Sequence, residues 1–199
     1  MKILFAASEC VPFVKTGGLA DVMGALPKAL AREGADVRVI LPLYRAIDAG
    51  VREKLEHVLY FYNNLGWRRQ YVGIEKLERD GVVYYFVDNE QYFGRDYIYG
   101  SGEDEGERFA YFCKAVLESI PKIDFVPDVL HCHDWQAAMT PVYLRALYHD
   151  WCPQTKLVFT IHNVEYQGKY GPETVEDLFG LNRGWYDGGI LRMDGCVNL

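Results

Sequence analysis

The sequence predicts an α/β fold: a Rossmann-like, doubly wound domain on a mainly parallel sheet, with an antiparallel hairpin insertion. A βαβ unit opens the chain, because a buried apolar strand over residues 2–7 precedes a helical repeat over 18–33 and a second strand over 36–41. The alternation of strand and helix returns over residues 128–161. Between these regions, Asp80-Gly81 separates two runs of β-branched and aromatic residues, which predicts a tight hairpin turn.

The other elements follow from the same patterns. Pro27 lies inside the first helical repeat and should kink or divide that helix. Residues 89–106 are rich in glycine, tyrosine and acids without a period, so a long loop is expected there. The chain becomes irregular after Ile161 and ends without a stop signal, so we expect a piece of a longer protein. The remaining predicted strands cover residues 59–63, 71–78, 82–88, 128–132 and 156–161, and the remaining helices cover 107–120 and 136–148.

Composition excludes several classes of protein. Of 199 residues, half are hydrophobic, and 21 Lys and Arg against 28 Asp and Glu give a net charge of −7. This chain can bury a core, and its charge disfavours nucleic acid and anionic membranes as partners. No apolar run approaches the roughly 20 residues of a membrane span. The 5 cysteines are scattered without a C-x-x-C spacing, which favours a reduced, cytoplasmic location over a disulfide framework or zinc ribbon.

The chemistry should lie just after the parallel strands, because ligands of open α/β sheets bind beyond the carboxyl ends of the strands. Polar and glycine-rich residues follow three predicted strands, over residues 8–21, 131–136 and 162–168. We expect these segments to meet at one cleft.

The first segment favours an anion. Gly17 and Gly18 permit close approach of a ligand to the backbone at a helix N-terminus, and Lys15 adds a charge that could meet a phosphate. The alternative is that the glycines only shape the turn from strand to helix. Neither G-x-G-x-x-G nor G-x-x-x-x-G-K-[ST] is present, which disfavours a dehydrogenase and a P-loop nucleotide hydrolase.

The second segment contains His131, Cys132, His133 and Asp134, all potential metal ligands. Neighbouring side chains of a strand point to opposite faces and cannot converge on one ion, so we predict no metal site. His131 and Cys132 are interpreted as core residues. His133 and Asp134 lie at the end of the strand and are expected to face the cleft, where a carboxylate can accept hydrogen bonds from sugar hydroxyls.

The third segment places His162 and Asn163 at another strand end, with Tyr166 and Gln167 close behind. Imidazoles, amides and aromatic rings are the groups that hold hydroxyl-rich ligands. The alternative is that Asn163 and Gly168 only shape a turn.

Taken together, these segments resemble the N-terminal catalytic domain of the bacterial glycogen synthase and plant starch synthase family. The likeness is carried by S-E-C-V-P at 8–12, K-T-G-G-L-A-D-V at 15–22, H-D-W at 133–135, T-I-H-N at 160–163 and Y-Q-G at 166–168. The resemblance implies a retaining glucosyltransferase that moves glucose from ADP-glucose to the non-reducing end of an α-1,4-glucan. It also implies a two-domain GT-B fold, of which residues 1–199 form the N-terminal domain. We expect no cofactor and no metal, because Lys15, a helix N-terminus and the partner domain would meet the phosphates.

The resemblance assigns residues to the donor. It implies that Lys15, Gly17 and Gly18 meet the donor diphosphate, that Asn163 helps to fix the cleft, and that Tyr99 is a loop tyrosine of the sugar site.

It also assigns the residues nearest the reaction. His162 would contact the transferred glucose and support the developing positive charge through its backbone carbonyl, while Asp21 and Asp134 would orient sugar hydroxyls. Gln136 departs from the histidine that often follows His-Asp-Trp in this family.

Two other readings stay open. One is a glucan-binding or regulatory module on a degenerate transferase domain, although intact Lys15 and His162 argue against decay. The other is a GT-B transferase that uses UDP-glucose, because the residues that read the base lie in the second domain. That C-terminal domain is expected in cis, and the isolated fragment is predicted to be inactive without it.

Overall fold

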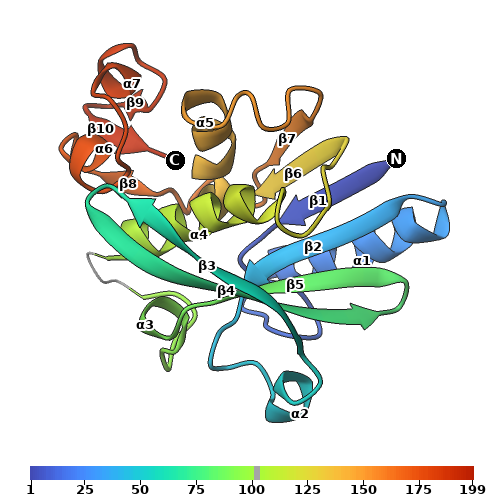
Figure 1. The fold of residues 1–199 in the computed structure, drawn as a ribbon. Helices are drawn as coiled ribbons and strands as arrows, with labels where there is room; N and C mark the ends of the chain where they lie inside the picture. The colour runs from blue at the N-terminus through green and yellow to red at the C-terminus, as the bar shows by residue number, and fades with distance from the viewer. Residues whose placement is uncertain (101–103) are drawn as a thin grey trace.

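The computed structural model describes residues 1–100 and 104–199. In this described part, a seven-stranded sheet has the strand order β3-β4-β5-β2-β1-β6-β7 (Figure 1). The strands are β1 (Lys2–Ala6), β2 (Asp36–Pro42), β3 (Glu56–Leu65), β4 (Arg68–Arg79), β5 (Val82–Asp88), β6 (Val129–His133) and β7 (Lys156–Thr160).

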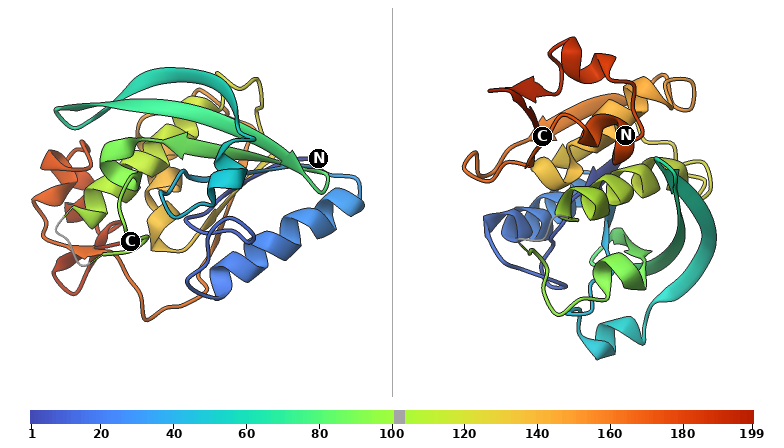
Figure 2. Two further views of the ribbon diagram at one scale, coloured as in Figure 1. Left: turned by 90° about the horizontal axis from the view of Figure 1, so that it is seen from below. Right: turned by 90° about the vertical axis from the view of Figure 1, so that its left-hand side faces the viewer.

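Five neighbouring strands of the sheet, in the order β5-β2-β1-β6-β7, are parallel to one another, as the sequence predicts. The chain leaves β1 through α1 (Gly18–Arg32) toward β2, and it leaves β5 through α4 (Glu105–Ser119) toward β6 on the other side of β1. Because such crossovers are right-handed, the two helices cover opposite faces of the sheet (Figure 2). The prediction of a doubly wound domain is therefore confirmed, and the strand order reverses between β1 and β6.

The middle of the chain forms the predicted antiparallel insertion. β4 pairs with both β3 and β5, so a long ribbon extends the parallel sheet at one edge and curves over α4 (Figure 2). Asp80 and Gly81 have φ angles of 54° and 77°, the left-handed conformations that a primed two-residue turn requires. This turn confirms the hairpin.

The segment predicted as one long loop, residues 89–106, is partly helical. It contains the short α3 (Glu90–Phe93), whose first turn is capped by Asn89 Oδ1 accepting from the Tyr92 amide at 3.0 Å. The segment also contains the start of α4, while its residues 101–103 lie outside the described residues.

The predicted helix over residues 136–148 also differs. It divides into a 3₁₀ turn (Trp135–Ala137) and α5 (Met139–Ala146). After β7 the chain is irregular, as expected, with only short elements. These are β8 (Lys169–Tyr170), α6 (Thr174–Asp177), α7 (Gly184–Asp187), β9 (Arg192–Met193) and β10 (Cys196–Asn198). Earlier in the chain, the short helix α2 (Ala49–Arg52) lies between β2 and β3. Within residues 1–100 and 104–199, no helix has the length and apolar character needed to cross a membrane.

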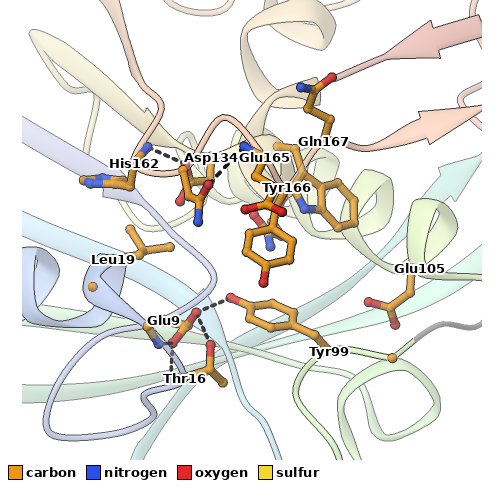
Figure 3. Close-up of a pocket in the computed structure, with 16 residues that line it drawn as sticks. Glu9, Thr16, Leu19, Tyr99, Glu105, Asp134, His162, Glu165, Tyr166 and Gln167 are labelled. Atoms are coloured by element: carbon orange, nitrogen blue, oxygen red, sulfur yellow. Dashed lines mark hydrogen bonds between the residues drawn. The ribbon is translucent and has the colours of Figure 1, made fainter.

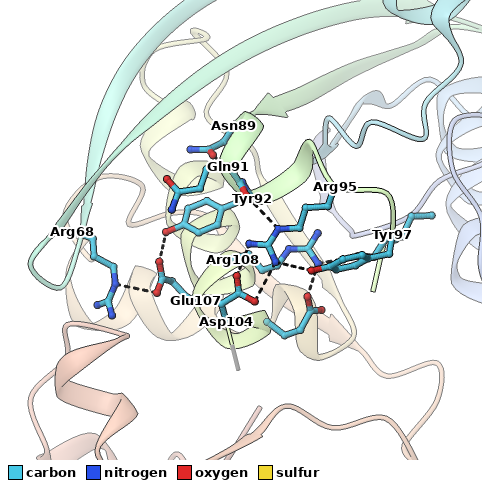
Figure 4. Close-up of polar contacts among 11 residues, drawn as sticks. Arg68, Asn89, Gln91, Tyr92, Arg95, Tyr97, Asp104, Glu107 and Arg108 are labelled. Carbon is cyan, nitrogen blue, oxygen red and sulfur yellow. Dashed lines mark hydrogen bonds and ion pairs between the residues drawn. The ribbon is translucent and has the colours of Figure 1, made fainter. Parts of the chain in front are cut away.

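A buried guanidinium holds the start of α4 to the segment before it. Arg108 is fully buried, and its Nη1 donates to Glu105 Oε1 at 2.5 Å and to the Ile98 carbonyl at 3.1 Å. Next to it, Arg95 forms a bidentate contact with Asp104 (Figure 4). Removing one partner of such a buried pair is costly, so these contacts define where residues 95–100 lie.

Pro27 does not divide α1, which runs unbroken from Gly18 to Arg32. A proline lacks the amide that would bond to the carbonyl four residues earlier, here that of Met23. The Cys10 thiol lies 3.3 Å from the Met23 carbonyl, and also 3.3 Å from the Val11 carbonyl, so one S–H can satisfy the carbonyl that Pro27 leaves free. Burial raises the pKa of Cys10 to about 12, which keeps the thiol protonated as a donor.

This compensation predicts a coupling between Cys10 and Pro27. Cys10→Ala should lower the free energy of unfolding by about 1–3 kcal/mol, because it leaves a buried carbonyl unpaired. In a Pro27→Ala background the restored amide can serve the same carbonyl, so the loss should shrink by on the order of 1 kcal/mol. Urea unfolding of the four proteins measures this difference.

Cys132 provides the control, because it is also fully buried but lies in β6, away from the helix. Cys132→Ala should cost the same in both backgrounds. Equal losses for Cys10→Ala with and without Pro27 would contradict the role given to the thiol.

Candidate active site

A cavity of about 710 Å³ opens at the carboxyl ends of β1, β6 and β7, where the strand order reverses. Its walls come from the three segments that the sequence indicates. These are Glu9 and residues 16–19 after β1, residues 134–136 after β6, and residues 162–163 and 165–167 after β7. Figure 3 shows Glu9 and Thr16 on one wall and Asp134 and His162 on another. The predicted meeting of these segments at one cleft is confirmed.

The Glu9 carboxylate organises the first wall, and it is only 3% exposed. It accepts hydrogen bonds from the Thr16 amide, the Thr16 hydroxyl at 2.7 Å, the Gly17 amide at 3.2 Å and the Tyr99 hydroxyl at 2.6 Å. An internal anion therefore occupies backbone donors that the sequence suggested for a phosphate. Sequence reasoning missed Glu9, although a carboxylate directly after a buried strand and shortly before a Gly-Gly turn was the available signal.

Gly17 and Gly18 both line the cavity, and both lie beside open space. Gly17 caps the N-terminus of α1 in an extended conformation that any residue can adopt. A Cβ atom added at either glycine would meet nothing within 4 Å. The turn therefore does not require glycine for its own packing, which weakens the alternative that the pair only shapes the turn.

Lys15 and Asp21 are placed differently from the other predicted site residues. Lys15 Nζ lies 2.7 Å from both oxygens of Asp21, and both side chains are about half exposed. Within the described part of the chain, neither residue lines the cavity. The structure thus pairs them with each other beside the first turn of α1, and Lys15 must leave this exposed, weak ion pair to reach a ligand.

Asp134 connects the second and third walls. Its φ of 56° and ψ of 176° lie in a backbone region that is strained by about 1–3 kcal/mol for any residue except glycine. Strain of this kind is concentrated at functional sites. The conformation is held by its amide, which donates to the Thr160 carbonyl at 2.9 Å, and by its Oδ1, which accepts from the His162 amide at 2.7 Å. Asp134 therefore faces the cavity, as predicted, and also positions the backbone of His162.

The histidines of β6 lie on one face of the strand. Cys132 is fully buried, which confirms its interpretation as a core residue. His131 is only half-buried, so its interpretation as a core histidine holds in part: its ring bonds the Thr160 hydroxyl at 2.8 Å and packs on Phe5. The expectation that His133 faces the cleft is wrong: it is 1% exposed, packs against Phe5, and does not line the cavity. Burial, with smaller contributions from the neighbouring histidines, lowers the pKa of His133 to about 3.

Tyr99 and Asn163 both line the cavity. The Tyr99 hydroxyl lies 2.6 Å from both Ser8 Oγ and Glu9 Oε1, and burial raises its pKa, so it remains a neutral donor. Asn163 Oδ1 accepts from the Glu165 amide at 3.0 Å, which is a turn-forming contact. Asn163 therefore shapes the turn as well as the wall, and the structural alternative holds for it in part.

The charges of the lining are one-sided. The described lining residues include four carboxylates and no lysine or arginine; the acids are Glu9, Glu105, Asp134 and Glu165. The rest of the lining supplies amides, an imidazole and the rings of Tyr99, Trp135 and Tyr166. In residues 1–100 and 104–199, no group of three or more acidic, histidine or cysteine side chains is arranged to hold a metal ion. This lining suits a neutral, hydroxyl-rich ligand.

The chain matches known proteins over its whole length. The family model for the starch synthase catalytic domain matches residues 2–199. The chain is 51% identical over 201 residues to a glycogen synthase of Streptococcus agalactiae serotype Ia and 54% identical over 200 residues to one of Anoxybacillus flavithermus. Each alignment includes 100% of this chain but only 42% and 41% of the relative, so the chain spans less than half the length of these proteins.

Solved structures agree on the fold. The catalytic domain of starch synthase IV from Arabidopsis thaliana, bound to ADP and acarbose, superposes with a TM-score of 0.87 at 28% identity, covering 98% of this chain and 41% of that one. Sucrose-phosphate synthase from Thermosynechococcus elongatus, at 15% identity and a TM-score of 0.51, covers 82% of this chain and 33% of that one and shares the fold alone. The predicted Rossmann-like, GT-B architecture is confirmed. The chain belongs to the starch synthase catalytic domain family, the glycosyltransferase family of bacterial glycogen synthases and plant starch synthases.

Proposed function

We propose that this chain forms the sugar-binding wall of an enzyme that transfers glucose from ADP-glucose to the non-reducing end of an α-1,4-glucan, with retention of configuration. The starch synthase IV structure, which contains ADP and acarbose, supports an adenine nucleotide and a glucan-like ligand in preference to UDP-glucose. The 42% coverage of the glycogen synthases supports a second domain in cis as the opposite wall.

The observation that carries the proposal is the chemistry of the cavity lining. Carboxylates, amides and an imidazole at the strand ends match the hydroxyl groups of a hexose. A diphosphate would be repelled by Glu9, Asp134 and Glu165, because charges interact strongly in a partly desolvated site, whereas Arg108 balances the charge of the fourth carboxylate, Glu105. The cations that neutralise the leaving diphosphate must therefore come from Lys15 and from the partner domain.

The backbone contacts restrict which groups can meet the donor. The Gly17 amide is already bonded to Glu9, so the diphosphate contacts fall to the Gly18 amide and Lys15, while Gly17 contributes space. Asp134 has one oxygen engaged by the His162 amide and can offer the other to a sugar hydroxyl. For Asp21, a sugar contact requires that its ion pair with Lys15 open.

The reaction balances with these groups. The bond between the anomeric carbon and the diphosphate breaks, the diphosphate leaves with the electron pair, and a glucan hydroxyl attacks from the same face. The proton of that hydroxyl passes to the leaving diphosphate. The His162 carbonyl would stabilise positive charge that develops on the sugar, which is the kind of preorganised dipole that lowers a transition state.

The proposal includes no cofactor and no metal, because Lys15, the N-terminus of α1 and the second domain would together meet the diphosphate. It also includes a cytoplasmic location, which the free thiols of all 5 cysteines support.

The requirement for both walls gives the first test. The isolated chain should incorporate less than about a tenth of the labelled glucose that the full-length protein transfers from ADP-glucose to glycogen, because half of the electrostatic groups are missing. Incorporation is measured at equal molar concentration, with circular dichroism to establish that the fragment is folded. Fragment activity within tenfold of the full-length protein would rule out the two-wall argument.

Metal independence gives the second test. Transfer by the full-length protein should be unchanged after dialysis against EDTA. Loss of activity that returns with one equivalent of a divalent cation would overturn this part of the proposal.

Substitutions at Lys15 and His162 should change different kinetic constants. Lys15→Ala removes a charge-assisted contact of about 1.5–3 kcal/mol, so the KM for the donor should rise roughly 10- to 150-fold. His162→Ala removes the imidazole that lines the cavity and leaves the backbone carbonyl in place, so kcat should fall through the loss of the ring's contact with the reacting sugar while the donor KM changes less. Both are measured with saturating glucan in the full-length protein.

Lys28 is the matched control, because this lysine of α1 also forms an ion pair, with Asp80 at 2.8 Å, but does not line the cavity. Lys28→Ala should leave both constants unchanged. If Lys15→Ala also leaves both unchanged, the glycine pair is only a turn and Lys15 has no donor contact.

A further inference from the structure

His133 and His162 are joined by a hydrogen bond behind the cavity wall. His133 Nδ1 lies 2.8 Å from His162 Nε2, and the two ring planes are inclined by only 16°. Their centroids are 5.1 Å apart, the separation expected when two imidazoles meet edge to edge in one plane. The contact is therefore a directed hydrogen bond between a buried residue of β6 and a residue that lines the cavity.

The surroundings of His133 limit how it can share this bond. Burial lowers the pKa of His133 to about 3, so the ring is neutral and carries one N–H and one acceptor nitrogen. Its Nε2 is buried and has no partner in the described part of the chain. A buried N–H without an acceptor is rarer in proteins than an unsatisfied acceptor, so the proton is expected on Nδ1.

The position of the proton on His133 determines which tautomer His162 adopts. If His133 Nδ1 donates, His162 Nε2 must accept, and the N–H of His162 then lies on Nδ1. Among residues 1–100 and 104–199, no hydrogen bond engages His162 Nδ1. The nitrogen that stays available to a ligand is thus the one that carries the proton.

We propose that His133 is a positioning residue: its Nδ1–H donates to His162 Nε2, fixes the ring plane, and makes His162 Nδ1–H a hydrogen-bond donor for a sugar hydroxyl in the cavity. The inference rests on the proposed function for its effect on transfer, but the bond itself does not.

His131 separates this role from simple packing. It lies two residues earlier on the same face of β6, stacks on His133 with centroids 4.1 Å apart, and packs on Phe5 in the same way. Its hydrogen bond, however, goes to the Thr160 hydroxyl and not to His162. His131 thus shares the packing of His133 without sharing its bond.

Two substitutions at His133 test the bond against the packing. His133→Asn keeps an amide donor near the position of Nδ1 and loses the ring, whereas His133→Phe keeps a ring and loses the donor. In the full-length protein, kcat should fall roughly 2- to 12-fold in His133→Phe, the equivalent of one hydrogen bond between neutral groups, with a smaller change in donor KM. His133→Asn should retain most of the wild-type kcat.

His131→Phe is the matched control and should leave kcat unchanged. The reverse order, with His133→Phe active and His133→Asn impaired, would show that packing matters and would overturn the proposal. Equal loss in His131→Phe and His133→Phe would overturn it as well.

A spectroscopic measurement tests the bond without any activity. In histidine-selective ¹⁵N spectra of the ligand-free, full-length protein, His162 Nδ1 should carry the proton and Nε2 should have the shift of an acceptor nitrogen. In His133→Phe a mixture of the two tautomers is expected. A proton on Nε2 of His162 in the native protein would overturn the assigned direction of the hydrogen bond. If His162 carries its proton on Nδ1 but the full-length protein transfers no glucose, the proposed function is wrong while the hydrogen bond stands.

Discussion

The Glu9 carboxylate brings together parts of the chain that are far apart in sequence. It accepts from the backbone and hydroxyl of Thr16, from the Gly17 amide and from the Tyr99 hydroxyl. Tyr99 lies 90 residues after Glu9 in the sequence, and its segment is held by the buried Arg108. A buried carboxylate is tolerated only when several donors satisfy it, so the loop before α1 and the segment before α4 are constrained together. The shape of the cavity depends on this one anion.

The same anion bears on the proposal that the cavity is one half of an active site. Donors at the start of a helix usually attract phosphates, but here the protein has satisfied some of them internally. What faces the cavity is a surface of carboxylates and neutral polar groups, with the nearest predicted cation, Lys15, bound to Asp21. Under the proposed function, a charged donor would be held tightly only when another surface closes over it. Weak binding of the diphosphate by this wall alone would then also ease release of the product.

Local patterns predicted the parts of the structure that depend on local physics. Asp80-Gly81 defined a hairpin because few residues adopt left-handed conformations, and the strand ends located the cavity because parallel sheets place their carboxyl ends together. The undivided helix at Pro27 was not predictable, since the compensating thiol of Cys10 is a tertiary contact. His133 was placed wrongly for a similar reason. Alternation gives the face of a strand, but not whether side chains of other segments, here Phe5 and His162, cover a residue on that face.

The open space beside Gly17 and Gly18 has a consequence for the unfolded chain. Neither glycine adopts a conformation that excludes a side chain, and a Cβ atom would meet no neighbour. Each glycine adds conformational freedom to the denatured ensemble, and alanine at a compatible position typically gains about 0.4–1 kcal/mol by removing it. The folded domain thus gives up stability at two successive positions without any return in packing. The native protein is therefore less stable than the same fold with alanine at these two positions would be. That loss of stability keeps the N-terminus of α1 free of side chains.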